Sequence, residues 1–89
     1  MVTNWYIIYI ILSVVNYIFV TNLRGANLEN ANFKNADLKL ADFYSANLTN
    51  ADLSGADLRK AFLGSADLSN ADLECANLQD AVLDNAILS

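Results

Sequence analysis

The chain of 89 residues contains no histidine, no proline and only one cysteine, Cys75. Without histidine there is no imidazole to act as a general base near neutral pH or as a metal ligand. A single cysteine forms neither an intrachain disulfide nor a cysteine zinc cluster, and no imidazole can activate its thiol. Bare carboxylates are the only candidates left for hydrolytic chemistry. We therefore predict no catalytic residue, no metal site and no cofactor, and we interpret Cys75 as an inert corner residue.

Positive charge is absent from the C-terminal third of the chain. Residues 61–89 hold five carboxylates and no lysine or arginine, whereas residues 21–60 hold five carboxylates and all five cations. Nucleic acid binding needs cations that neutralise phosphates, so we expect no direct nucleic acid contact. An acidic surface suits a basic partner or serves solubility.

A strict five-residue repeat runs from Thr21 to Ser89. Every fifth residue is leucine or phenylalanine, and the residue two places earlier is alanine, with Thr21 opening that series. The large positions are Leu23, Leu28, Phe33, Leu38, Phe43, Leu48, Leu53, Leu58, Leu63, Leu68, Leu73, Leu78, Leu83 and Leu88. Because regular repeats stack their apolar residues on identical neighbours, this period specifies an architecture rather than an activity.

A period of five excludes both an α-helix and a plain strand. In a helix, five steps rotate the apolar position by about 140°, so that it would spiral around the surface. In a strand, an odd period would move the leucine to the opposite face at each repeat. The pattern fits if Ala and Leu point inward and the two residues after Leu form a turn. The second turn residue is Gly, Asn, Ser or Asp in most units, as tight turns favour, and the exceptions are Leu40, Lys60 and Cys75.

The units A-N-L-E-N, A-D-L-K-L, A-N-L-T-N, A-D-L-S-G and A-D-L-S-N resemble pentapeptide repeats of the A-(D/N)-L-x-x type, and the resemblance covers residues 21–89. It implies an all-β fold, a right-handed quadrilateral β-helix in which four pentapeptides make one turn and residues 20 apart stack. Residues 21–89 would then form about 3.5 coils. We expect the Asp or Asn before each Leu to edge the strands and accept backbone hydrogen bonds.

Residues 1–20 break the repeat with an apolar run, in which only Ser13 and Asn16 are distinctly polar after Trp5. As a helix, residues 5–20 would span about 24 Å, a little less than the ~30 Å hydrocarbon core. We predict that this run precedes the repeat domain as a separate N-terminal segment and forms a single-pass membrane helix. Its membrane residues would be Trp5, Tyr6, Ile7, Ile8, Tyr9, Ile10, Ile11, Leu12, Val14, Val15, Tyr17, Ile18, Phe19 and Val20.

Two other readings of the N-terminal segment remain open. A cleaved signal peptide would need a basic n-region and an A-x-A site, and neither is clear here. A cap on the first coil could be helical or formed by strands, which the Ile, Val and Tyr content also suits. Cations follow the run and do not precede it, so the positive-inside rule places the repeats in the cytoplasm. With a cap in place of an anchor, the alternative is a soluble cytoplasmic protein.

Four outward positions carry large apolar side chains. Phe62, Val82 and Ile87 stand where the repeat has Asp or Asn, and Tyr44 occupies a first turn position. On the coil that the resemblance implies, Tyr44, Phe62 and Val82 share one wall, and Ile87 lies on the next. Scattered surface apolarity is common, but a cluster near the open end of a β-helix also suits association. We predict an association patch formed by Tyr44, Phe62, Val82 and Ile87.

These features predict a non-catalytic protein-interaction or structural scaffold module that is tethered to a membrane. Many proteins that resemble this chain dimerise through their C-terminal ends, so a homodimer through the C-terminal coil is expected. The alternative function is DNA mimicry, because some proteins with this repeat resemble duplex DNA and bind the topoisomerase DNA gyrase. The same coil would place Lys39, Arg59 and Lys60 in a short basic stripe, which we interpret as solvated charge or as a screen for the neighbouring aspartates.

Overall fold

The computed structural model describes residues 21–89. The predicted membrane segment, residues 5–20, lies outside the described residues, and so does the choice between an anchor, a signal peptide and a cap. No helix long and apolar enough to cross a bilayer occurs between Thr21 and Ser89.

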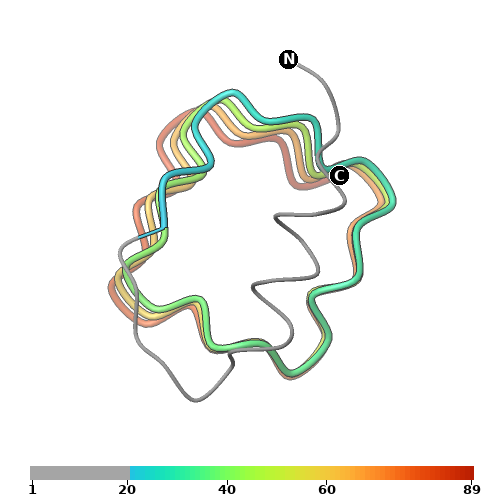
Figure 1. Cartoon of the computed structure of the whole chain (residues 1–89), viewed down its shortest axis with the longest axis vertical. Coiled ribbons are helices and arrows are strands. Elements are labelled where there is room, and N and C mark those ends of the chain that lie inside the picture. Colours follow the sequence, from blue (N-terminus) through green and yellow to red (C-terminus); the bar gives the residue numbers. More distant parts are fainter. Residues whose placement is uncertain (1–20) are drawn as a thin grey trace.

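The described chain is a stack of coils in which each residue lies beside the residue 20 positions later. Ten isolated parallel bridges set this register, from Asn22 with Asp42 to Asp67 with Ile87, and each links the residues that precede two large core positions. Between residues 21 and 89 there is no helix, and no strand is longer than one bridge residue. Figure 1, viewed down the stack, shows the coils superimposed in a closed, roughly four-sided outline. The predicted stacking register is confirmed, and the expected short strands are reduced to single bridge residues because a turn follows each one.

Backbone hydrogen bonds join each coil to the next in a repeating pattern. The Leu23 N–H donates to the Asp42 carbonyl at 2.8 Å, and the Asp42 N–H donates back to the Thr21 carbonyl at 2.8 Å. Each turn is closed by a hydrogen bond from the alanine N–H to the carbonyl of the core residue three positions earlier, as from Ala26 to Leu23 at 3.1 Å. A five-residue unit with a coil on each side therefore pairs its backbone N–H and carbonyl groups through one turn and through ladder contacts with both neighbouring coils.

The second turn residue of every unit from Gly25 to Asn85 has a positive φ. With a positive φ at this position and a hydrogen bond across the four residues, the turns have the type II arrangement. This conformation directs the N–H of that residue toward the next coil, as from Gly25 to the Tyr44 carbonyl at 2.8 Å. The turns predicted from the sequence are confirmed, and Leu40, Lys60 and Cys75 also adopt positive φ values of 65°, 61° and 60°.

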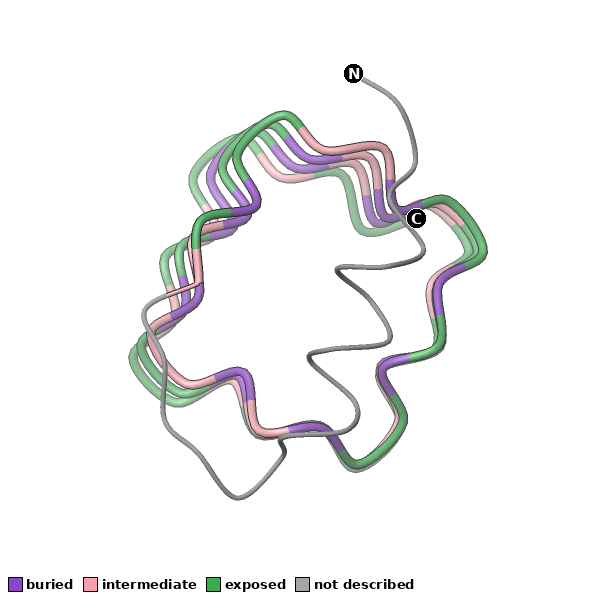
Figure 2. Cartoon of the chain, in the orientation of Figure 1, coloured by how far each residue is buried: buried purple, intermediate pink, exposed green. Residues whose placement is uncertain are grey.

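The interior contains the inward alanine, leucine and phenylalanine side chains, as the repeat predicts. Figure 2 shows buried positions alternating with exposed ones around each coil. Phe33 and Phe43 pack edge to face, with ring centroids 6.0 Å apart. The buried core consists of Leu23, Leu28, Ala31, Phe33, Ala36, Leu38, Ala41, Phe43, Ala46, Leu48, Ala51, Leu53, Ala56, Leu58, Ala61, Leu63, Ala66 and Leu68. The equivalent residues of the last coil, such as Leu73 and Leu83, are only partly buried.

The outward Asp or Asn before each core leucine caps the turn that follows. Its side-chain oxygen accepts a hydrogen bond from the N–H two residues later, as in Asn32 to Lys34 at 3.0 Å and Asp72 to Glu74 at 2.9 Å. This contact is the Asx-turn that these residue types favour. The predicted backbone role of these positions is therefore confirmed, and Phe62, Val82 and Ile87 have no oxygen with which to perform it.

Candidate functional site

All four residues of the predicted association patch have exposed side chains. Their exposed fractions are 44% for Tyr44, 46% for Phe62, 39% for Val82 and 48% for Ile87. Phe62 bridges to Val82, which places both on one wall, whereas Ile87 bridges to Asp67 on another wall. The structure thus brings three of the four residues together and leaves Ile87 apart from them.

Tyr44, Phe62 and Val82 line a groove of about 500 Å³. We call it the wall groove, and its other principal residues are Arg24, Asp42, Gly64 and Asp84. Two columns of residues spaced by 20 form its surface. One column precedes the core leucines and contains Asp42, Phe62 and Val82, and the other follows them and contains Arg24, Tyr44, Gly64 and Asp84.

Gly64 makes the hollow in this wall. A Cβ at position 64 would lie 3.1 Å from Cδ1 and 3.3 Å from Cε1 of Tyr44, closer than side-chain carbons normally pack. The tyrosine ring therefore lies over the glycine, and Gly64 is buried although it occupies a turn. Gly64 has no positive φ, unlike Gly25 and Gly55, so this glycine provides space for the ring rather than a special backbone conformation. The repeat pattern alone does not single out Gly64, although its position 20 residues after an outward tyrosine is a usable signal.

Arg24 closes the N-terminal end of the wall groove. Its Nε lies 2.9 Å from Oδ2 of Asp42, and its guanidinium carbon lies 4.8 Å from the centre of the Tyr44 ring. A guanidinium at this distance from an aromatic face makes a cation–π contact. Arg24 therefore packs on the Tyr44 ring and at the same time forms an ion pair with Asp42.

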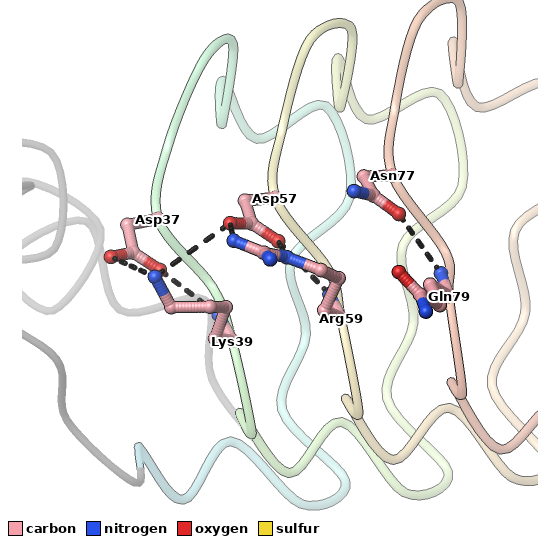
Figure 3. Close-up of polar contacts among 6 residues, drawn as sticks. All are labelled: Asp37, Lys39, Asp57, Arg59, Asn77 and Gln79. Carbon is pink, nitrogen blue, oxygen red and sulfur yellow. Dashed lines mark hydrogen bonds and ion pairs between the residues drawn. The ribbon is translucent and has the colours of Figure 1, made fainter.

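A second polar cluster occupies a different wall. The Lys39 Nζ lies 3.3 Å from Asp37 and 3.7 Å from Asp57, and Arg59 pairs with Asp57 through contacts of 2.6 and 2.9 Å. Figure 3 shows these four residues, with Asn77 and Gln79 at the next level. The predicted basic stripe is therefore correct in position for Lys39 and Arg59, and both cations are neutralised by stacked aspartates.

The same cluster shifts the ionisation of Asp57. Hydrogen bonds from the Arg59 guanidinium lower the pKa of Asp57 from 3.8 to about 2. The pKa values of Asp52 and Asp67 are also lowered, in each case chiefly by the hydroxyl of the serine two residues later. These carboxylates are held in their charged form by their turns, which suits a structural role.

The depressed pKa of Asp57 predicts a loss of stability in acid. A group whose pKa falls on folding stabilises the fold above its unfolded value, and that contribution disappears as the pH drops from about 4 to 2. Because the pair is partly exposed and screened by solvent, we expect Asp57 to contribute about 1 kcal/mol of this loss. Urea unfolding at pH 7, 4 and 2 should show a smaller acid-induced change for Asp57→Asn and for Arg59→Gln. An unchanged pH dependence in both variants would show that the pair contributes nothing to it.

The remaining chemistry of the described chain is sparse. Residues 21–89 contain no group of three or more His, Cys, Asp or Glu side chains that could hold a metal ion. The Cys75 thiol is free and exposed. Asp52 and Asp72 stack in one column, where each caps its own turn.

Comparison with known proteins agrees with this geometry. A family model for pentapeptide repeats matches residues 21–59 and 51–89. The crystal structure of Rfr23, a pentapeptide repeat protein from the cyanobacterium Cyanothece 51142, aligns with a TM-score of 0.74 and 36% identity. That alignment covers 76% of this chain and 47% of Rfr23, so the chain spans about half the length of that protein.

Two structures from Nostoc PCC 7120 also match, with lower TM-scores. HetL, a pentapeptide repeat protein involved in regulating heterocyst differentiation, is 32% identical over 75% of this chain and 38% of its own, with a TM-score of 0.36. The protein alr5209 is 34% identical over 93% of this chain and 77% of its own, with a TM-score of 0.34. A search of curated proteins found no match.

The family model and the Rfr23 structure place the coil in a known class. Proteins built from such repeats form right-handed quadrilateral β-helices and are generally non-catalytic scaffold or interaction modules. The register of 20 residues, the turn after each core leucine and the inward Ala and Leu positions all fit that class. The chain belongs to the pentapeptide repeat family.

Proposed function

We propose that this protein is a non-catalytic interaction module that binds a protein partner through the wall groove and is tethered to a membrane by residues 5–20. The observation that carries the proposal is the apolar surface of the groove, where Tyr44, Phe62 and Val82 are all exposed. A cluster of exposed apolar side chains rimmed by charged ones is typical of a protein interaction site.

The repeat itself makes these side chains informative. Most positions before a core leucine carry Asp or Asn, which cap the next turn at distances near 3 Å. Phe62 and Val82 cannot form this turn-capping hydrogen bond, and both expose apolar surface to water. Neither change helps the coil to fold, so a contact outside the coil explains them better than stability does.

The test replaces the apolar pair with the residue that the repeat favours. Phe62→Asn with Val82→Asn should keep the fold, because each asparagine can cap its turn, and should weaken self-association through the wall groove. We would measure the mass of the full chain by sedimentation in density-matched detergent, where the monomer mass is 9.7 kDa. The matched control exchanges the equivalent residues of another wall, Asn32→Asp with Asp52→Asn. An unchanged oligomer in the first variant would remove the wall groove from the proposal.

The last coil is a second candidate contact surface. Ile87 and Leu88 are exposed to 48% and 54%, and the inward residues of this coil are only partly buried. Within the described residues no backbone acceptor faces the N–H groups of Leu73, Leu78 and Leu83, although their counterparts in earlier coils are paired. A second copy that stacks on this end would continue the ladder. Leu88→Asp in the same sedimentation experiment tests this end-to-end homodimer, since a charge at the joint would disrupt it.

The tether rests on the composition of residues 5–20 and has its own test. The full chain should be recovered with membranes and released by detergent but not by carbonate, because its apolar run can lie in the bilayer. A chain that begins at Thr21 should remain in the supernatant. Recovery of both forms in the supernatant would contradict the tether and leave the interaction surface unaffected.

A further inference from the structure

The wall groove carries opposite charges at its two ends. The column that follows the core leucines contains Arg24, Tyr44, Gly64 and Asp84, each 20 residues after the last and therefore one coil further along the stack. Arg24 lies at the N-terminal end and Asp84 at the C-terminal end, with the tyrosine and the glycine between them. The Asp84 carboxylate makes no hydrogen bond or ion pair with residues 21–89, whereas Arg24 pairs with Asp42.

When a second copy of this column runs in the opposite direction, its charged ends are complementary to those of the first. If two copies pack wall to wall with their coil axes antiparallel, a two-fold axis across the middle of the wall places Arg24 opposite Asp84 of the second copy. The same rotation brings the two Tyr44 rings, each of which lies over Gly64 of its own chain, together near the two-fold axis. The contact between Arg24 and Asp84 then forms twice, as an isologous interface requires.

The parallel arrangement lacks this match. With parallel axes, the two Arg24 side chains lie at one level and the two Asp84 side chains lie at another. Like charges that face each other across an interface disfavour the complex. The guanidinium of Arg24 carries five donors, so it can keep its contact with Asp42 and still donate to a second carboxylate.

We infer that the occupant of the wall groove is a second copy of this chain, packed antiparallel with Arg24 of each copy against Asp84 of the other. The inference rests on the proposed function, in which this wall is an interaction surface. The column spans three coil steps, or about 14 Å along the axis. Such a contact is smaller than a standard protein interface, so the dimer is weak, depends on concentration and loosens as salt rises.

A charge-exchange experiment with the full chain in detergent tests this geometry. Both chains carry Asp42→Asn, so that an aspartate at position 24 meets no carboxylate within its own chain. One chain then carries Arg24→Asp and the other carries Asp84→Arg. Each alone should self-associate at least about tenfold more weakly than the Asp42→Asn parent, because both symmetric contacts become repulsive. An equimolar mixture should recover the parent affinity, because both contacts in the heterodimer pair opposite charges.

The outcomes separate this inference from the proposed function. Recovery in the mixture, measured by sedimentation and by co-purification of differently tagged chains, supports the antiparallel dimer. A parent that associates while the mixture stays monomeric overturns the antiparallel geometry and leaves the wall as an interaction surface. Single variants that associate as strongly as the parent overturn it in the same way. A parent that stays monomeric up to millimolar concentration overturns the second copy as the occupant. Circular dichroism spectra that match the parent confirm that each variant is folded.

Discussion

Replacing Phe43 with alanine should lower the unfolding free energy of the repeat domain by about 3–5 kcal/mol, the usual range for a buried phenylalanine. Phe43 is completely buried, and its ring packs edge to face on Phe33 at a centroid distance of 6.0 Å. The coils above and below are held in place by their hydrogen bond ladders, so they cannot close in on the space that the ring leaves. Because small domains have only a few kcal/mol of net stability, most of the variant should be unfolded at 37 °C.

The matched control for Phe43→Ala is Phe62→Ala, which removes the same ring from an exposed position on the wall. Thermal unfolding followed by circular dichroism should show a large loss for the first variant and a change within about 0.5 kcal/mol for the second. Equal losses in the two variants would mean that the inward and outward positions of the repeat have been assigned incorrectly.

Replacing Lys60 and Cys75 with asparagine should stabilise the domain. Both residues are exposed and adopt a positive φ near 60°, a conformation that is unfavourable for most side chains but that asparagine tolerates. We expect a gain of about 0.5–1 kcal/mol at each position. For a domain of this size, the double variant should melt roughly 5–12 °C higher than the wild type.

Two further variants show whether this gain comes from the backbone. Glu74→Asn places asparagine at the neighbouring turn position, where φ is not positive, and should leave the melting temperature unchanged. Lys60→Val puts a β-branched residue where φ is positive and should lower the melting temperature. If Glu74→Asn stabilised the domain as much as the double variant, the positive φ would not be the cause.

The sequence predicts the coil well because each repeat gives the same local information. Ala and Leu spaced by two define the inward face, and a small or polar residue two places after Leu marks the turn. At Leu40, Lys60 and Cys75 the residue type argues against the turn, yet the chain turns there as well. Ladder contacts impose this conformation. Leu40 and Lys60 still donate their N–H groups to the Arg59 and Gln79 carbonyls at 3.1 and 3.0 Å, and next to Cys75 the Glu74 carbonyl accepts from the Gly55 N–H at 2.8 Å.

The candidate site could be predicted only in part. The outward direction of Tyr44, Phe62 and Val82 follows from the repeat, and their common wall follows from the 20-residue stacking that the family resemblance supplied. Two features depend on side-chain conformations in neighbouring coils. The Tyr44 ring packs over Gly64, and Arg24 contacts both Tyr44 and Asp42. The five-residue period contains no information about those conformations. For the same reason, the sequence placed Lys39 and Arg59 near aspartates but did not show which carboxylate each of them pairs with.

The central claim is that residues 20 apart in the sequence stack directly on one another, and spin labelling tests it most directly. Labels at Asn50→Cys and Asn70→Cys, in a Cys75→Ser chain, occupy equivalent turns of adjacent coils because Asn50 and Asn70 are 20 residues apart. The control pairs Asn50→Cys with the native Cys75, which is 25 residues away and therefore one repeat out of register. Stacked coils should give strong spin exchange in the first pair, from labels about 5 Å apart at the backbone, and much weaker coupling in the control. Equal coupling in both pairs, or stronger coupling in the control, would contradict the 20-residue register.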